Sequence, residues 1–425
     1  MNSILPLNNL PVNYSPALSN PKLNPNKPYT ISMKSVDSIQ KIGRAADPEI
    51  IPAKMLLSLL KSGLNDDAKI DEKLFQGRTK EDWIRLNNLA IDNAVAPTVF
   101  NGLEKNPNIK VPEEVAANLK ESKEYAKKYH GLQEKLLGEF SDFTKSKGID
   151  TVQMKGIGFS MNYPDPTARF GGDIDIYNFK HGTNPSDPKN NMSLMTDKIA
   201  EKSGIEVALD HGPKHSEIKY KGMPIENHRN FLNIEIGPLH KKMNSYLLKH
   251  LNPVQETLPH GTKILVPSKE FNNVFISFHA MQHFVGSGIN FHHLADWAVQ
   301  VKKHGLTIPE EAKGTKFEEF MYAFTNLANK HLGTNVKVPE NKKLENEIFD
   351  KMLHPERSNN LGVPTPKSKN PVSMVVYKYK KIAANTARYN QYWGTDKTVT
   401  QACFDSLIRH FKKPKTFLDV FTKLK

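Results

Sequence analysis

The sequence has a single cysteine, Cys403, among its 425 residues, so it cannot carry an internal disulfide framework. It also lacks an apolar run long enough to span a bilayer, and its first residues lack the charged start, apolar core and cleavage site of a secretory signal. These absences exclude disulfide-framed secreted domains and membrane-spanning classes. The expectation is a cytoplasmic protein without a transmembrane segment, in keeping with a reducing compartment.

What is present points to phosphate chemistry in residues 154–176. A glycine turn with a lysine beside it, Lys155-Gly156, precedes two aspartates at i and i+2, Asp173 and Asp175. Side chains alternate along a strand, so both carboxylates are expected on one face and the intervening isoleucines on the other. The pattern predicts a site that faces outward above a core that faces inward.

The two carboxylates would raise each other's pKa unless a cation compensated them. Mg²⁺, or Mn²⁺ in its place, takes oxygen ligands and commonly combines carboxylates with substrate phosphates. Gly171 and Gly172 lack a Cβ and would let a triphosphate come close. The alternative is an edge strand whose aspartates face water.

Two cations, Lys155 and Arg169, stand near these carboxylates in the sequence. Their functional interpretation is phosphate binding and neutralisation of the charge that builds on a leaving pyrophosphate. The alternative is ion pairing to Asp165, Asp173 or Asp175. Both can hold if a phosphate displaces the ion pair.

The surrounding residues predict a short strand at 149–154, a helix at 156–161 and a second strand that carries the aspartates. The run Lys155-Gly156, Tyr163-Pro164, Arg169 and Asp173-Ile174-Asp175 resembles the signature of the uncharacterised nucleotidyltransferase family, a branch of the superfamily that includes DNA polymerase beta. The resemblance extends over residues 82–305. It implies an α+β fold, with a small mixed sheet and helices as a polymerase-beta-like nucleotidyltransferase core.

The superfamily also has a third carboxylate on a later strand. Glu226, on a predicted strand at 223–228, is our choice, and the family resemblance points to the same residue. Glu235 is the second candidate. A solvent-facing glutamate in a hairpin is the structural alternative for Glu226. His215 and His228 flank the same region and are expected to support the site rather than to act in it.

His279 and His283 lie at i and i+4 of a predicted helix, a spacing that can bind zinc. A metal there would need another ligand, such as Asp296. The favoured interpretation is a packed, hydrogen-bonded histidine pair that lines the cleft.

The chain is expected to divide into modules. A Pro- and Asn-rich tail at residues 1–45 is predicted to be disordered, because it holds too few apolar residues to offset its ordering entropy. A helical module at 46–147 leads into the nucleotidyltransferase core at 148–245. A second helical module at 246–335 and a basic, partly helical region at 336–425 follow.

The end of the chain is strongly basic. Residues 367–425 hold 13 Lys and Arg against three Asp, a net of +10 out of the formal +14 of the whole chain. Interleaved aromatic residues are typical of nucleic-acid surfaces, where rings stack on bases. A solvated face of an amphipathic helix, or contact with an anionic membrane surface at 417–425, are the other interpretations.

The working hypothesis is an enzyme. With Asp173, Asp175 and Glu226 holding two Mg²⁺, and Lys155, Gly156 and Arg169 holding the triphosphate, it would move a nucleoside monophosphate from a nucleoside triphosphate such as ATP to an acceptor hydroxyl, releasing pyrophosphate. The acceptor is left open. The alternative is a catalytically silent family member that binds nucleic acid through residues 367–425. A zinc enzyme built on His279, His283 and Asp296 is a third hypothesis.

Overall fold

The fold is built around a 7-stranded mixed sheet in the order β3-β4-β5-β2-β1-β7-β6. This computed structural model describes residues 50–210, 212–286, 288–354, 363, 364, 366, 368 and 370–404. The tail predicted at 1–45 and the end of the basic region from 405 lie outside these residues. The strands are β1 (Ile149–Gln153), β2 (Ile174–Lys180), β3 (Glu206–Asp210), β4 (His215–Tyr220), β5 (Met223–His228), β6 (Val254–Thr257) and β7 (Lys263–Val266).

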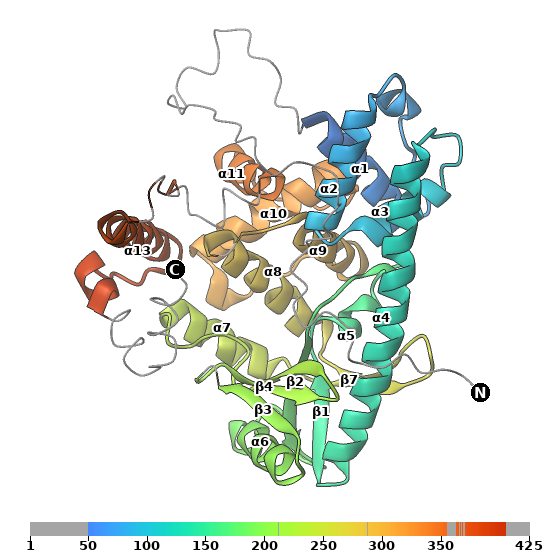
Figure 1. The fold of residues 1–425 in the computed structure, drawn as a ribbon. Coiled ribbons are helices and arrows are strands. Elements are labelled where there is room, and N and C mark those ends of the chain that lie inside the picture. Colours follow the sequence, from blue (N-terminus) through green and yellow to red (C-terminus); the bar gives the residue numbers. More distant parts are fainter. Residues whose placement is uncertain are drawn as a thin grey trace.

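Helices precede and follow the sheet in sequence (Figure 1). Those before it are α1 (Ile50–Leu64), α2 (Lys80–Asp92), α3 (Ala96–Glu104) and α4 (Glu113–Lys145), and those between its strands are α5 (Ile157–Ser160), α6 (Ser193–Lys202) and α7 (Pro238–Lys249). Those after it are α8 (Lys269–Val285), α9 (Phe291–His304), α10 (Lys316–Leu332), α11 (Lys342–Leu353) and α13 (Pro371–Trp393). Short 3₁₀ helices occupy Glu72–Phe75, Pro166–Ala168, Pro188–Asn190 and Glu310–Ala312.

Local chemistry accounts for several helix ends. Thr79 and Asp82 form a capping box at the start of α2, and Ser268 caps α8 by accepting a hydrogen bond from the amide of Phe271. Gly333 ends α10 in the left-handed conformation, which costs glycine little because it has no Cβ.

The central strand β2 separates two cores. Ile174 and Ile176 pack in a cluster with Leu137 and Phe140 of α4. The alternate residues, Asp175 and Tyr177, therefore point to the opposite face. There the ring of Tyr177 contacts Phe231, which in turn meets Phe271 of α8. Asp175 thus faces the helices that follow the sheet.

The long helix α4 belongs to both cores. Val115 and Leu119 near its start join the cluster of α1 to α3, and Leu137 and Phe140 near its end cover the sheet. Figure 1 shows α4 running along the side of the molecule from the first helices to β1. The first helical module therefore continues into the sheet without a linker.

The α+β class predicted from the sequence is confirmed, with a mixed sheet flanked by helices. Two local expectations need correction. The helix expected at 156–161 is only Ile157–Ser160, because Gly156 has a φ of 65° and lies outside it. Asp173 immediately precedes β2 instead of lying within it. Of the two aspartates, only Asp175 lies on the strand.

The sheet also extends beyond the boundary expected at residue 245. The hairpin of β6 and β7 lies in the segment expected to be helical, and β7 pairs in parallel with β1. The division into modules at 46–147, 148–245, 246–335 and 336–425 stays a prediction, but the sheet crosses one of its limits.

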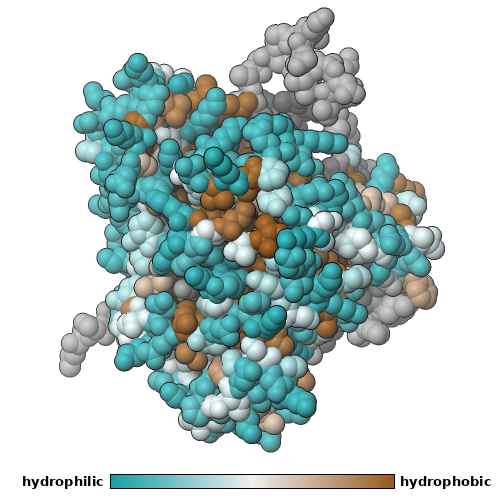
Figure 2. Space-filling view, turned by 180° about the vertical axis from the view of Figure 1, so that it is seen from behind, coloured by the Kyte–Doolittle hydropathy of each residue, from teal (hydrophilic) through white to brown (hydrophobic). Residues whose placement is uncertain are grey.

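The face shown in Figure 2 is largely hydrophilic, with hydrophobic patches between the polar residues. Within the described ranges, none of the helices combines the length and the apolar character needed to cross a bilayer.

Candidate active site

The predicted phosphate-binding residues and the predicted aspartate pair line one pocket, whereas Glu226 is not part of its lining. This pocket lies where the β1–α5 turn and the segment before β2 meet α8 and α9. Its lining comprises Lys155, Gly156, Arg169, Gly171, Gly172, Asp173, Asp175, Ile276, His279, His292, His293 and Asp296. Two parts of the chain that are far apart in sequence therefore build it together.

The floor of the site is a buried carboxylate held between two cations. Asp175 is 1% exposed, and Lys155 Nζ lies 3.4 Å from its Oδ2. On the other side His228 Nε2 lies 3.1 Å from Oδ1. Burial by itself lowers the pKa of His228, but its contacts with Asp175 and Glu226 outweigh burial and raise that pKa. These contacts favour the protonated form of His228, whose positive charge compensates the buried carboxylates.

Glu226 is the neighbour of Asp175 in the sheet. The parallel pairing of β2 with β5 sets the two residues opposite each other, and the same His228 Nε2 lies 3.3 Å from Glu226 Oε2. Burial opposes ionisation of Glu226, yet His228, Lys155 and Lys214 together hold its pKa below the ordinary value. Two carboxylates thus lie side by side on neighbouring strands.

Asp173 completes the acidic group from an exposed position at the edge of the pocket. The surrounding protein displaces water and Asp175 lies nearby, and these effects raise the pKa of Asp173 to about 6, although Lys155 opposes them. A carboxylate with a raised pKa beside another acid is the electrostatic pattern that a bound cation relieves.

The donor set fits a hard divalent cation. Oδ2 of Asp175 is buried and receives no hydrogen bond from the described residues. Together with Asp173 and Glu226 it offers carboxylate oxygens only, which suit Mg²⁺ or Mn²⁺. These three carboxylates are the metal ligands that the sequence analysis predicted.

Lys155 and Gly156 shape the turn at one wall of the pocket. Gly156 has a φ of 65°, and a Cβ there would lie 3.1 Å from the carbonyl oxygen of Asp173. A side chain at this position would therefore be strained and would crowd the acidic segment. Burial lowers the pKa of Lys155, but Asp175, Glu226 and Asp173 outweigh it and raise that pKa, so the ammonium stays charged.

Another part of the pocket lining depends on an ion pair that the sequence did not predict. Arg169 Nε and Nη2 donate to Asp296 Oδ1 and Oδ2 at 2.8 and 2.7 Å, and Nη1 donates to the Gly156 carbonyl at 2.9 Å. Tyr163 donates its hydroxyl to the same carboxylate at 2.6 Å. Arg169 thus pairs with Asp296 instead of with the aspartates near it in sequence. Among the described residues, the group of possible metal ligands that contains His279 and His283 includes His293 and does not include Asp296.

The glycine pair is anchored to α4. The Tyr129 hydroxyl donates to the Gly172 carbonyl at 3.0 Å, and the Gln133 amide donates to the same carbonyl at 3.2 Å. A Cβ at Gly171 would lie 3.3 Å from Arg169 Nη1, whereas one at Gly172 would meet open space. The segment before Asp173 is therefore held in place while one side of it stays open.

The other predicted residues fall in different places. Glu235 is exposed in a turn after β5, whereas Glu226 is in register with Asp175. His215 Nε2 lies 3.7 Å from Glu226 Oε1 and so borders the site, as expected. Sequence reasoning missed His292 and His293 as pocket residues, because nothing in their spacing relates them to the acidic strand.

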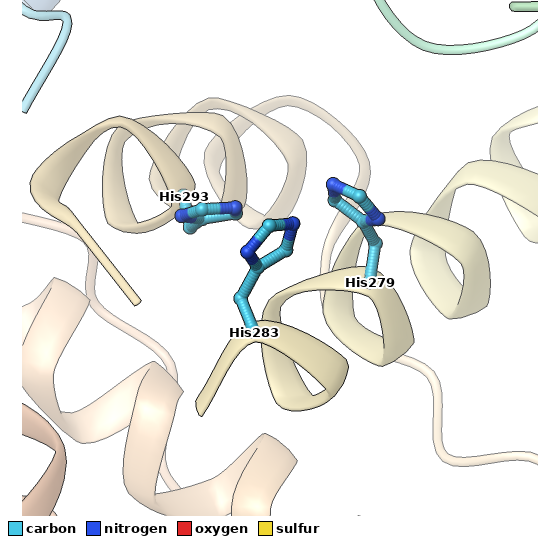
Figure 3. Close-up of side chains that lie close together, drawn as sticks. All are labelled: His279, His283 and His293. Carbon is cyan, nitrogen blue, oxygen red and sulfur yellow. The ribbon is translucent and has the colours of Figure 1, made fainter. Parts of the chain in front are cut away.

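His279 and His283 do face each other across one turn of α8, with ring centres 4.6 Å apart. His293 of α9 joins them, with its ring centre 4.5 Å from that of His283 (Figure 3). The pair expected from the sequence is thus part of a cluster of three histidines.

One of three comparisons with known proteins found a match. A family model described as uncharacterised nucleotidyltransferase matches residues 79–333, which contain the whole sheet and the pocket. No curated protein sequence and no solved structure matches the chain. Because the matched residues make up more than half of the 425, the chain belongs to the uncharacterised nucleotidyltransferase family.

Proposed function

We propose that this protein transfers a nucleoside monophosphate from a nucleoside triphosphate to a hydroxyl group of an acceptor. The observation that carries the proposal is the meeting of Asp173 and Asp175 with Lys155 and the glycine pair in one pocket, with Glu226 in register beside Asp175. Nucleotidyl transfer is also what the name of the family describes.

The three carboxylates are the metal ligands in this proposal. Asp173, Asp175 and Glu226 would hold divalent cations, which when bound would lower the pKa of the acceptor hydroxyl and neutralise charge on the phosphates. His228 bridges Asp175 and Glu226 and keeps both carboxylates oriented while it compensates their charge. We therefore assign His228 to positioning.

The cations act on the triphosphate and on the turn beside it. Lys155 can exchange its 3.4 Å ion pair with Asp175 for a phosphate oxygen and stabilise the leaving pyrophosphate. Arg169 lines the pocket, but its guanidinium is occupied by Asp296 and by the Gly156 carbonyl. We assign it chiefly to holding the turn, with its positive charge contributing to the potential of the pocket.

The reaction then requires the acceptor oxygen to attack the α-phosphate while the bond to pyrophosphate breaks. The open side at Gly172, where no side chain intrudes, gives room for the triphosphate next to Asp173. The acceptor proton leaves with the solvent or with a pocket base. A hydroxyl of a sugar, a small molecule, an RNA or a protein would satisfy this chemistry.

The test is binding of each of the four ribonucleoside triphosphates, with and without Mg²⁺, to the wild type and to the Asp173→Ala/Asp175→Ala variant. We expect binding that depends on Mg²⁺ and disappears in the variant. Glu235→Gln serves as the control, because this glutamate is exposed in a turn. If the folded wild type binds none of the triphosphates, the proposal fails. Salt-sensitive RNA binding that survives loss of both aspartates would then favour the nucleic-acid-binding alternative at residues 367–425.

A further inference from the structure

The histidine cluster beside the pocket has a donor chemistry different from that of the carboxylates. His279 and His283 come from successive turns of α8, and His293 comes from the first turn of α9. One ring nitrogen from each lies within 4.8 Å of those of the other two. Figure 3 shows the three side chains converging on the space between the two helices.

We propose that His279, His283 and His293 form a binding site for one divalent transition-metal ion of the zinc class, separate from the carboxylate site. Two histidines at i and i+4 plus one from a neighbouring helix are a donor arrangement that tetrahedral Zn²⁺ accepts, with its fourth position left for another ligand. Neutral imidazoles select zinc, cobalt, nickel or copper over Mg²⁺, which prefers oxygen. This inference does not depend on the proposed transferase activity.

The protonation state favours metal binding. Burial lowers the pKa of His283 to about 4, and burial with Lys155 nearby holds the pKa of His279 well below its ordinary value. The same causes, with His283 as a neighbour, lower the pKa of His293. Burial thus favours the neutral form of each imidazole, which has one nitrogen lone pair that can bind a metal.

Hydrogen bonds to His283 and His293 affect how these two rings could bind a metal. The ring of His283 is hydrogen-bonded to the backbone of Gly288, the kind of contact that orients metal-binding histidines. Nδ1 of His293 accepts a hydrogen bond from the Asn290 amide at 3.3 Å, which places its ring proton on Nε2. Binding through Nε2 would move that proton to Nδ1 and replace this one hydrogen bond with a metal–nitrogen bond. The cap from the Asn290 side chain to the amide of His293 would remain.

The site opens to the pocket. His279 and His293 both line it, together with Asp173 and Asp175. The open fourth position of the metal is thus available to an oxygen of whatever the pocket binds. One cavity would hold two kinds of cation site, one made of carboxylate oxygens and one made of imidazole nitrogens.

The proposal can be tested with metal alone on the full chain. The protein is stripped with a chelator, supplied with excess Mg²⁺ to occupy the carboxylates, and titrated with Zn²⁺ against a chromophoric competitor. Co²⁺ then replaces Zn²⁺ to record the visible absorption of a tetrahedral site. We expect about one Zn²⁺ per chain, with an affinity reduced about tenfold or more in His279→Ala and His283→Ala.

His331→Ala is the matched control, because His331 on α10 also has a pKa lowered to about 4 by burial but stacks on Phe349. It should bind Zn²⁺ like the wild type, as should Asp175→Asn. If an alanine variant does not fold by circular dichroism, His279→Gln or His283→Gln replaces it under the same criterion. The proposal is overturned if the wild type binds no Zn²⁺, if the cluster variants bind it unchanged, or if only Asp175→Asn loses it.

Discussion

At the scale of single residues, Glu226 and Glu235 offer a direct comparison. Glu226→Gln keeps the shape of a side chain that touches His228 but removes the negative charge beside Asp175. We expect nucleotidyl transfer to fall about 100-fold or more, the usual loss when one preorganised electrostatic contact is removed. Release of pyrophosphate from each triphosphate measures it. Glu235→Gln should keep wild-type turnover, and an equal loss in both variants would contradict the assignment of Glu226.

A second prediction at this scale concerns the contribution of the Arg169–Asp296 pair to stability. Arg169→Lys keeps the charge but cannot reproduce two parallel hydrogen bonds to a carboxylate and a third to the Gly156 carbonyl. We expect the free energy of unfolding to fall by about 2 kcal/mol or more, because the hydrogen-bonded groups are buried.

Denaturant unfolding measures this loss. Arg85→Lys is the control, because Arg85 pairs with Glu81 at the surface of α2 with its Nε 3.2 Å from the carboxylate. That change should stay within about 0.5 kcal/mol. Equal stability of Arg169→Lys and the wild type would show that the fork geometry is not needed.

The residues that could be predicted from the sequence are those whose relation is local. Lys155 follows β1 closely, Asp173 lies just before β2 and Asp175 within it, and β2 is the next strand along the chain and the antiparallel neighbour of β1, so consecutive elements bring them together. The partners Arg169 and Asp296 are 127 positions apart, and the contact depends on how α9 packs on the turn. His293 was missed for the same reason, since no local period links α8 to the first turn of α9.

At the scale of elements, one buried glutamate ties the β6–β7 hairpin to α4. The Glu134 carboxylate accepts hydrogen bonds from the amides of His260 and Thr262 at 3.0 Å each and contacts His260 Nδ1 at 2.9 Å. Glu134→Ala leaves these amides without their partner, and we expect a loss of about 1–3 kcal/mol in the free energy of unfolding. Glu139→Ala is the matched control, because Glu139 on the same helix pairs with Lys221 at the surface. Equal losses in both variants would contradict this role.

The same glutamate gives a prediction about pH. Burial raises the pKa of Glu134, but the hydrogen bonds from Thr262 and His260 outweigh it and lower that pKa below 4.5. A carboxylate with a lowered pKa in the folded state stabilises the protein above its unfolded pKa and loses this contribution as pH falls. The stability difference between wild type and Glu134→Gln should therefore be constant above pH 4.5 and shrink below it. Unfolding curves recorded across this range test it, and a difference that grows at low pH would contradict it.

The hairpin that Glu134 holds was not predicted, and the reason lies in its residues. All four residues of β6 are exposed, so no apolar alternation marks it as a strand. β7 is only four residues long and pairs with β1 through tertiary packing. β5, which alternates between buried and half-buried positions, was located correctly because burial of one face determines its pattern, and β2 was found except that Asp173 lies just before it.

At the scale of the whole molecule, the described part of the basic region is attached to the fold. The family match ends at residue 333, and α13 begins beyond it. Arg388 of α13 donates to the carbonyls of Phe284 and Val285 at 2.7 and 3.0 Å, which caps the end of α8. The end of α8, the helix that carries His279 and His283, is thus hydrogen-bonded to α13, which lies outside the family match.

Trp393 is a buried apolar contact of this attachment, and its removal tests how firmly α13 is held. Its ring is 4% exposed, stacks on Phe278 of α8 at 5.2 Å and meets His240 of α7 at 4.6 Å. Trp393→Ala should lower the free energy of unfolding by about 3–5 kcal/mol, since it empties a site between three helices. Tyr379→Ala, on the same helix but 56% exposed, should change it by less than about 0.5 kcal/mol. Denaturant unfolding of both variants distinguishes a helix that belongs to the core from a nucleic-acid module that only adjoins it. A small effect of Trp393→Ala would mean that α13 docks weakly, and the basic surface at 367–404 would then be available as an independent binding segment.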